Sequence, residues 1–551
     1  MNQSGHLDGT IIDAVHRTIF TGRITWTEGR ITSITPQSGP DPGRYILPGF
    51  IDAHVHIESS MLTPYEFARQ ALIHGTVATV SDPHEIANVC GLDGVHYMLE
   101  NARDARLKFH FGAPSCVPAT GFETAGAVLG VADLETLLQR SDIRYLSEMM
   151  NYPGVLFHDP VVMEKLALAR KYGKPVDGHA PGLTGDAAIA YINAGISTDH
   201  ECFTYDEALH KIQHGMKILI REGSAARNFE VLHPLISQYP DLVMLCSDDK
   251  HPDELLHGHI NTMVKRALIL GHDLFDVLQC ACLNPVAHYQ LPVGLLRVND
   301  PADFIVIDNP QDMNILETYI NGEKMASNGT CSLPPKNHPV INNFSASPKS
   351  PDDFLLPGNG TTVNVIEAID GQIVTSQSVA ETRNIGGYLE ADPSQDILKI
   401  TVVNRYNNAK PAVAFIKNFK LQQGAIASTV AHDSHNIIAV GTDNESLATA
   451  VNALIQHQGG LCVTTAGMTQ VLPLPVAGLM STGSCHDVGH QYSAIEAAVK
   501  AMGCDLRAPF MTLSFMSLLV IPRLKLSDRG LFDGTAFAFT SVQPEGEPAP
   551  A

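Results

Sequence analysis

The chain has 551 residues, of which 44% are hydrophobic and 17% are charged, and its formal net charge at pH 7 is −22. A single hydrophobic core stops growing at roughly 250–300 residues, so this length predicts two or three domains. The negative charge and the lack of a basic block exclude a nucleic-acid backbone as partner, because affinity for phosphates needs a Lys/Arg surface. No stretch reaches the ~20 apolar residues of a membrane span, and residues 1–9 carry no apolar export core, so we expect a cytoplasmic protein without a membrane partner.

Cysteine and histidine differ in what they indicate. The ten cysteines form no CxxC pair and follow no regular spacing, so neither a zinc knuckle nor a disulfide framework is indicated in a chain this large. Several of the 25 histidines, by contrast, stand at the ends of apolar runs. Their placement directs attention to the ends of the predicted strands.

The predicted elements change in character along the chain. Residues 9–36 alternate apolar and polar side chains with Gly and Thr turns, as antiparallel strands do, and this pattern returns at 304–308 and 318–320. In between, helical stretches separate several short apolar or β-branched runs. The runs lie near Ile51, Val77, Phe109, Tyr145, Val176, Ser197, Lys217 and Val243, and the helical stretches span 64–74, 92–105, 159–172 and 185–194.

Eight strand candidates alternating with helices predict an α/β fold, a (β/α)8 TIM-like barrel over residues 50–291 with its site at the carboxyl ends of the strands. Residues 1–49 and 292–340 are predicted to pair as one small composite β-sandwich domain. Beyond a Pro/Asn/Ser-rich stretch, residues 341–551 mix strands at 397–404 and 412–417 with a helix at 445–456. They predict a C-terminal α/β domain.

Side chains that bind metals stand at the ends of several barrel strands. His54 and His56 lie two apart on the first strand, so they face the same way and can reach one metal, although such a pair alone also fits packed or surface residues. Later strands end in Glu148, His179, His200 and Asp248. Together they offer nitrogen and oxygen ligands for two divalent ions, with Glu148 as the bridge. Buried structural residues would be the alternative, and that interpretation would have to hold at six equivalent positions.

The expected chemistry is hydrolysis of a C–N bond. Two metals would lower the pKa of a bridging water toward neutrality and so supply hydroxide at pH 7. Asp248 is expected to take the proton and pass it to the leaving nitrogen. Asp82, His84 and Glu85 follow the second strand, where they would bind or protonate a nitrogenous ring, begin a helix, or do both.

Three further groups of polar residues lie near these strand ends or in the C-terminal domain. Glu58 and Ser59, just beyond the histidine pair, are expected to contact substrate or to support the ligands. Arg221 and Glu222 end the seventh strand and are expected to form an internal ion pair. The cluster at residues 431–436 either reaches over the barrel mouth or is a polar turn in its own domain.

Several of these segments carry a family resemblance. Residues 47–56, LPGFIDAHVH, are similar to the strand-one signature of the amidohydrolase superfamily. The chain closely resembles the bacterial adenine deaminase family from about residue 47 to beyond residue 440. The motifs that carry this resemblance are HIESS (56–60), SDPHE (81–85), LSEMMN (146–151), DGHAPG (177–182) and AHDSHN (431–436).

The resemblance implies an activity and a cofactor. It implies deamination of free adenine to hypoxanthine and ammonia in purine salvage, by attack of metal-bridging hydroxide on C6, with Asp82 and Glu85 as substrate contacts. It also implies Mn²⁺ or Fe²⁺ rather than an obligate zinc pair, with Zn²⁺ still open. Many superfamily relatives bridge their metals with a carboxylated lysine where this chain has Glu148, so hydantoinase or dihydroorotase chemistry is less attractive.

Two other functions remain open from sequence. A cyclic amidohydrolase or an N-acetyl deacetylase would use the same metal barrel but release no ammonia. A non-catalytic metal-binding scaffold would recruit a partner through the third domain, although such a scaffold has no need of an acidic site. We also expect a homo-oligomer, because large metal barrels often assemble.

Overall fold

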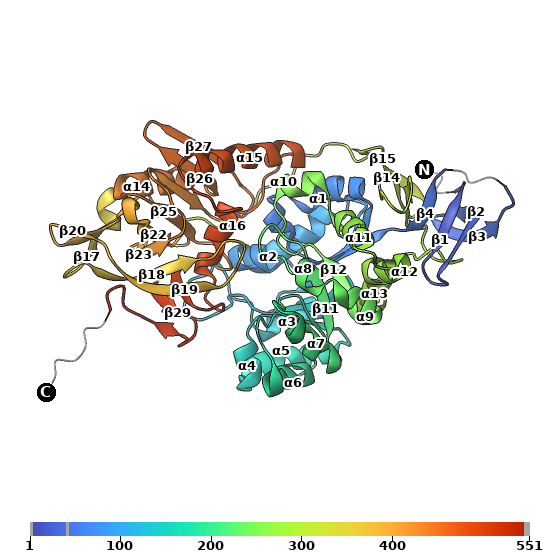
Figure 1. The fold of residues 1–551 in the computed structure, drawn as a ribbon, viewed down its shortest axis with the longest axis horizontal. Helices are drawn as coiled ribbons and strands as arrows, with labels where there is room; N and C mark the ends of the chain where they lie inside the picture. Colours follow the sequence, from blue (N-terminus) through green and yellow to red (C-terminus); the bar gives the residue numbers. More distant parts are fainter. Residues whose placement is uncertain (1–3, 40–42, 545–551) are drawn as a thin grey trace.

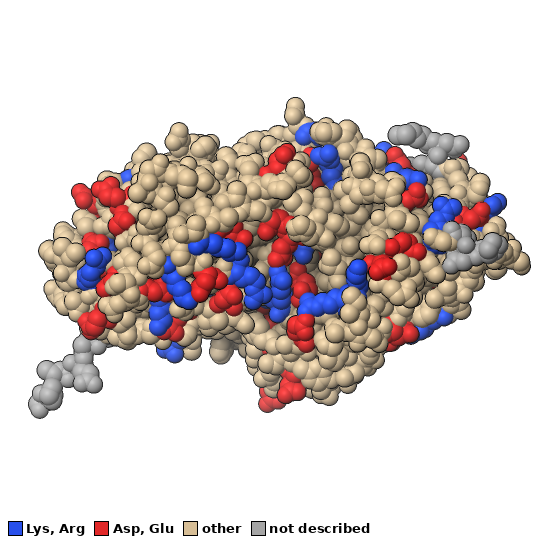
Figure 2. Space-filling model, turned by 45° about the horizontal axis from the view of Figure 1, so that its top comes forward, with Lys and Arg blue, Asp and Glu red and all other residues tan. Residues whose placement is uncertain are grey.

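The computed structural model describes residues 4–39 and 43–544, and three parts of the chain lie in a row in it (Figure 1). A sheet containing the first strands lies at one end, parallel strands with their helices lie in the middle, and the C-terminal segment lies at the other end. Within the described residues, no helix combines the length and apolar character that crossing a bilayer requires. On the face drawn in Figure 2, Lys and Arg alternate with acidic side chains along a belt across the middle.

Parallel strands form the middle part. Among the described residues they pair as a five-stranded sheet, in the order β5-β6-β7-β8-β9, and a three-stranded sheet, in the order β10-β11-β12. Both faces of β5 and β6 are buried, so their sequences, FIDAHV and TVATVS, show no regular alternation of apolar and polar residues. The bounds are β5 (Phe50–Val55), β6 (Thr76–Ser81), β7 (Lys108–Ala113), β8 (Ile143–Met149), β9 (Val176–Gly178), β10 (Thr198–Asp199), β11 (Lys217–Arg221) and β12 (Val243–Cys246).

Backbone hydrogen bonds connect these two sheets at both edges. Next to β9 and β10, the Ser197 N–H donates to the Val176 carbonyl at 2.9 Å. Next to β12 and β5, the Asp248 N–H donates to the His54 carbonyl at 2.9 Å, and the His56 N–H donates to the Asp248 carbonyl at 3.4 Å. Because all these strands are parallel, their carboxyl ends face one side of the molecule.

The helices of the middle part follow the strands. Asp159 accepts hydrogen bonds from two backbone N–H groups of α5 and Pro160 occupies its first turn, which explains where that helix begins. The expected helices at 64–74, 159–172 and 185–194 are confirmed within a few residues. The bounds are α1 (Pro64–Ala71), α2 (His84–Ala102), α3 (Val131–Leu138), α4 (Tyr152–Leu156), α5 (Pro160–Lys171), α6 (Gly185–Asn193), α7 (Tyr205–Gln213), α8 (Phe229–Leu232), α9 (Pro234–Gln238), α10 (Pro252–His257), α11 (Ile260–Ile269), α12 (Leu274–Leu278) and α13 (Asn284–Tyr289).

Helix α2 begins earlier than predicted. It starts at His84 and not at Leu92, although Gly91 inside it has φ 61° and interrupts the regular geometry. A glycine inside a helical pattern indicates a helix boundary, so the sequence did not predict the first two turns of α2. Its start places His84 and Glu85 in the first turn, so the expectation that this cluster begins a helix is confirmed.

One sheet combines the two ends of the N-terminal half. Strand β4 pairs in parallel with β1 and antiparallel with β13, so residues before and after the middle part share a sheet. Trp26 packs edge-on against Phe304 and Tyr319, with ring centroids 5.5 and 5.8 Å apart. The strand order is β16 (Thr330–Cys331), β15 (Glu323–Ser327), β14 (Ile315–Ile320), β13 (Phe304–Ile307), β4 (Tyr45–Pro48), β1 (Gly5–Asp13), β2 (Thr18–Thr27) and β3 (Arg30–Pro36).

The C-terminal part is built on a largely antiparallel sheet that carries α14 (Asn444–His457) and α15 (Cys485–Ala501). The strand order is β19 (Thr375–Glu381), β18 (Thr362–Ala368), β23 (Ala412–Lys417), β22 (Leu398–Val403), β25 (Ile437–Gly441), β24 (Ala425–Ser428), β26 (Gly460–Thr465) and β27 (Met468–Pro473). Smaller elements are β17 (Leu356–Pro357), β20 (Arg383–Ile385), β21 (Tyr388–Glu390), α16 (Pro509–Ser514), β28 (Leu524–Ser527), β29 (Gly530–Asp533) and β30 (Ala538–Phe539). Helix α15 packs against α10, which joins this part to the middle one.

Candidate metal centre and active site

The predicted ligand side chains come together at the carboxyl ends of the parallel strands. Each is at most 5% exposed. They are His54 in β5, His56 directly after it, Glu148 in β8, His179 after β9, His200 after β10 and Asp248 after β12. The alternation of strand and helix therefore converts six positions spread over about 200 residues into one buried cluster.

Glu148 lies at the centre of this cluster, and its two oxygens face different partners. Oε1 is 3.2 Å from His56 Nε2. Oε2 is 2.6 Å from His179 Nδ1 and 3.3 Å from His200 Nε2. Burial alone would raise the pKa of Glu148, but these histidines hold it well below its usual value. The carboxylate thus stays ionised and touches two separate histidine groups.

Asp248 completes the side of the cluster next to β5. Its Oδ1 is 3.3 Å from His56 Nε2 and 3.5 Å from His54 Nε2. Arg221 donates to its other oxygen, Oδ2. Burial opposes ionisation, yet the Arg221 guanidinium and the two histidines hold the pKa of Asp248 well below its usual value. Its backbone adopts a left-handed conformation, φ 53°, which is uncommon outside glycine and recurs at functional sites.

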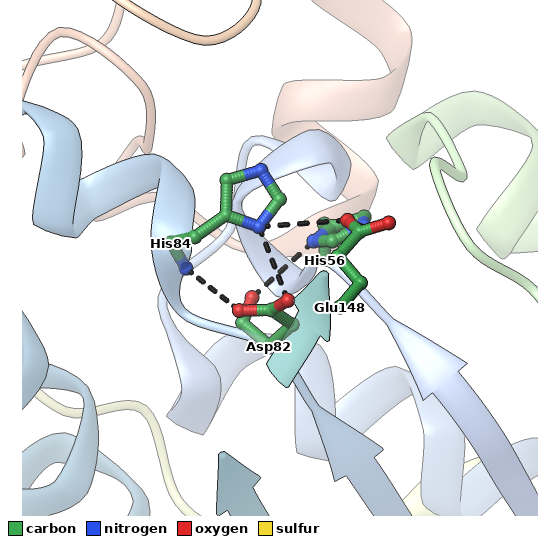
Figure 3. A group of neighbouring side chains, drawn as sticks. All are labelled: His56, Asp82, His84 and Glu148. Carbon is green, nitrogen blue, oxygen red and sulfur yellow. Dashed lines mark hydrogen bonds and ion pairs between the residues drawn. The ribbon is translucent and has the colours of Figure 1, made fainter. Parts of the chain in front are cut away.

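Asp82 and His84 adjoin the cluster from the start of α2 (Figure 3). His84 Nδ1 lies 3.2 Å from Asp82 Oδ2 and 3.6 Å from Glu148 Oε1, so the ring spans the two carboxylates. The Asp82 carbonyl lies 3.3 Å from His56 Nδ1 and fixes that ring from behind. Burial favours neutral His84, but Asp82 and Glu85 raise its pKa well above the ordinary value.

Glu85 joins the strand-end cluster to the C-terminal part. Its Oε1 lies 2.6 Å from His432 Nδ1, and its Oε2 contacts His435 Nε2. Although burial acts in the opposite direction, Glu85 raises the pKa of His432 to about 9. Burial lowers the pKa of His435, so at pH 7 Glu85 pairs with one charged and one neutral imidazole. Of the two roles open for residues 431–436, the structure shows the one that reaches the strand ends.

Glu58 and Ser59 lie in a 3₁₀ turn, Ile57–Ser60, beside the cluster. Glu58 Oε1 accepts the backbone N–H of Ile86 at 3.2 Å, while its other oxygen has no hydrogen-bond partner within the described chain. Burial raises the pKa of Glu58 to about 7. Ser59 donates to Asp249 at 2.5 Å. Both positions adjoin the site, and substrate contact by either one stays a prediction.

The expected ion pair between Arg221 and Glu222 is wrong. Arg221 makes a two-pronged pair with Glu201, at 2.6 Å for each bond, whereas Glu222 pairs with Arg266 at 3.0 Å. The physical reason is strand alternation, which sends consecutive side chains to opposite faces. The signal for Glu201 was available, since it directly follows a predicted ligand histidine.

The donor set fits divalent cations. Imidazole nitrogens and carboxylate oxygens suit borderline metals such as Zn, Fe and Mn. His54 Nε2 and His56 Nε2 lie only 3.1 Å apart, and groups of at least three ligand atoms converge on common points. One such group is His54, His56 and Asp248, and another is His179, His200 and Glu201. Glu148 lies between these two groups, as a bridging carboxylate would.

Apolar side chains from the C-terminal part close the site. Ile373, Phe515 and Leu518 line the same cavity as the ligand cluster, and the Phe515 ring stacks on His432 with centroids 4.8 Å apart. The cavity measures about 20 Å³, roughly the space that one water needs. The space beside the ligand cluster is therefore narrow, and these three side chains form the apolar part of its wall.

Comparisons with known proteins agree with this construction. Residues 45–325 match the sequence model described as "Amidohydrolase family", and residues 372–538 match that described as "Adenine deaminase C-terminal domain". The chain is 53% identical over 541 residues to "Adenine deaminase" of Salinibacter ruber, covering 98% of this chain and 99% of that protein. It is 52% identical over 547 residues to "Adenine deaminase" of Methanosarcina mazei, covering 97% and 98%. The protein of the same name from Borreliella burgdorferi is 48% identical over 541 residues, covering 97% and 98%.

Proposed function

The chain belongs to the adenine deaminase family of amidohydrolases and deaminates adenine, and we propose that the buried cluster at the strand ends carries out this reaction. The observation that supports the site most strongly is the convergence of four histidines on Glu148 and Asp248. The net reaction forms a bond from a water oxygen to C6 of adenine and breaks the bond from C6 to the exocyclic nitrogen. Its products are hypoxanthine and ammonia.

We propose that β5 to β12 form one closed (β/α)8 barrel over residues 50–291. The hydrogen bonds at both edges between the five-stranded and three-stranded sheets support this closure. Residues 1–49 and 292–340 then form the small composite β-domain. Residues 341–551 form the C-terminal α/β domain, which supplies His432 and His435 to the barrel mouth.

The proposed cofactor is a pair of divalent cations, Mn²⁺ or Fe²⁺. His54, His56 and Asp248 would hold one, His179 and His200 would hold the other, and Glu148 would bridge them. Such a pair lowers the pKa of a bound water toward neutrality and thereby makes a nucleophile available at pH 7. Arg221 orients Asp248 by its bond to the oxygen that faces away from the histidines.

The remaining acidic and imidazole groups transfer protons and bind the purine. Asp248 is the group that takes a proton from the attacking water, because Oδ1, the oxygen that Arg221 leaves unbonded, faces the histidine pair. His84, whose pKa is raised well above the ordinary value, protonates the purine or its leaving amine, and the Glu85 carboxylate, 3.6 Å from His84 Nε2, stabilises the charged ring. Asp82, Glu85, Glu58 and Ser59 form the polar wall that binds the base.

The alternatives open from sequence gain no support. The relatives named adenine deaminase align over nearly their whole length, including the C-terminal domain, so neither a cyclic amidohydrolase nor a scaffold is favoured. The test measures steady-state turnover of adenine, hydantoin, dihydrouracil and an N-acetyl amino sugar by one manganese-loaded preparation. Turnover restricted to adenine supports the proposal, and a preference for a cyclic amide would contradict it.

A further inference from the structure

A second cavity lies at the opposite ends of the strands from the metal centre. It measures about 490 Å³, within the ~300–1,000 Å³ of small-molecule pockets. Lys108 and His110 in the first half of β7 line it, and Arg30, Pro301 and Asn321 line it from the side of the composite sheet. The cavity therefore sits where the parallel strands meet that sheet, a common location for ligand sites.

The wall of this cavity is basic in a chain that is acidic as a whole. Its described lining includes Arg30, Arg103, Lys108 and Arg144 but only one carboxylate, Asp142. The chain overall has 58 acidic side chains against 36 lysines and arginines. Salt screens exposed charges beyond about 8 Å, so the local excess of positive charge, and not the net charge of the chain, determines which ligands the cavity attracts.

Two of these cations make no side-chain hydrogen bond or ion pair in the described chain, whereas Arg30 donates to the Asn299 carbonyl at 2.8 Å. Asp142 is already held by Arg140, which is outside the cavity lining, with bonds of 2.9 and 2.8 Å. Lys108 pairs with Asp303 at 2.6 Å. The guanidinium groups of Arg103 and Arg144, by contrast, make no hydrogen bond or ion pair with any described residue. They are free to bind the oxygens of an external anion.

His110 supplies an independent sign of a ligand. The residue is only 5% exposed and lines the cavity, yet its Nε2 has no hydrogen-bond partner within the described residues. Buried polar atoms are nearly always paired, so an unpaired one calls for a partner. Burial together with the nearby Arg144 and Lys108 lowers the pKa of His110 to about 3. The ring is thus neutral at physiological pH.

We propose that this cavity binds a phosphate monoester, with Arg103 and Arg144 on the phosphate oxygens and His110 as a further hydrogen-bond partner. A phosphate dianion matches two unpaired guanidinium groups better than a carboxylate does, because guanidinium forks recognise phosphate with paired hydrogen bonds. Leu99, Leu107 and Phe109 form an apolar wall against which the organic part of the ester packs. Orthophosphate alone would leave most of the volume unfilled.

Isothermal titration of the full-length, manganese-loaded protein tests the proposal. Ribose 5-phosphate is the ester probe, orthophosphate is the free anion, and both are titrated at constant ionic strength with adenine absent and then saturating. Arg103→Gln and Arg144→Gln each remove one unpaired guanidinium. Arg106→Gln is the matched control, because Arg106 is an exposed arginine nearby that does not line the cavity.

We expect one ester per chain, bound more tightly than orthophosphate and with an affinity that adenine leaves unchanged. Each cavity variant should weaken binding about tenfold or more, as loss of a charge-assisted hydrogen bond does, while the control variant should match the parent. Absence of saturable binding would overturn the proposal. So would displacement by adenine, equal affinity for orthophosphate, or equal weakening by the control variant.

Discussion

Glu85→Gln tests how the C-terminal domain contributes to the reaction. The carboxylate accepts from His432 at 2.6 Å and from His435, and it is 2% exposed. A glutamine keeps the shape but offers one acceptor oxygen, so one of the two contacts is lost. A net hydrogen bond to a charged group contributes roughly 1.5–3 kcal/mol, which sets the expected loss of stability.

The larger effect is expected on turnover. Loss of a group positioned for acid–base catalysis typically costs 10²–10⁴ in rate, so kcat for adenine should fall by about that factor when His84 loses its carboxylate partner. Metal content should stay unchanged, because Glu85 belongs to neither of the two proposed ligand sets that Glu148 bridges. Without the Glu85 charge the pKa of His432 should fall from about 9, so this ring should lose its proton at a lower pH in the variant than in the parent.

The assay combines hypoxanthine production, metal analysis and thermal unfolding on the same preparation. Glu135→Gln is the control, since Glu135 makes a surface pair with Lys171 that contributes about 0–1 kcal/mol. Full activity in Glu85→Gln would refute the proton role. Loss of metal would indicate that Glu85 is a metal ligand instead. Failure to fold would indicate that its role is structural, at the start of α2.

Three further outcomes follow from the same geometry. Asp248→Asn should retain much of the metal and lose most of the turnover, about 10²–10⁴-fold; a near-normal rate would remove Asp248 as proton acceptor. Glu148→Gln should lower metal occupancy below two per chain, measured by elemental analysis after dialysis, and two tightly held ions would argue against a bridge. Glu123 is buried and its pKa is raised to about 8 by burial, so folding opposes its ionisation and stability declines as pH rises from about 4.5 to about 8. Glu123→Gln should therefore raise Tm more at pH 8.5 than at pH 5, whereas an equal shift at both values would contradict the buried acid.

The strand ends were predictable because parallel strands impose a simple rule. Each ligand candidate directly ends or follows an apolar run, so its position could be read from the alternation of strands and helices. His179 and His200 illustrate this, since both come immediately after their strands. Glu201 directly follows one of these histidines, so the same rule could have indicated it, but its pairing with Arg221, 20 residues away, could not be read from the pattern.

Contacts between distant segments were harder to predict. The pairing of Glu85 with His435 spans 350 residues, and nothing in the local pattern of either segment specifies the other. The Ser59 contact with Asp249 is similar, at a separation of 190 residues. Only docking of the C-terminal part onto the strand ends, and closure of the strand ends on each other, bring such groups together.

The most direct test of the central claim is a metal count and product assay on one sample. Protein prepared with manganese in place of adventitious metal is supplied with free adenine, and hypoxanthine, ammonia and bound metal are measured together. The account predicts equal amounts of hypoxanthine and ammonia, with about two metal ions per chain. Two bound ions without ammonia release would contradict adenine deamination, and ammonia release from metal-free protein would contradict the proposed centre.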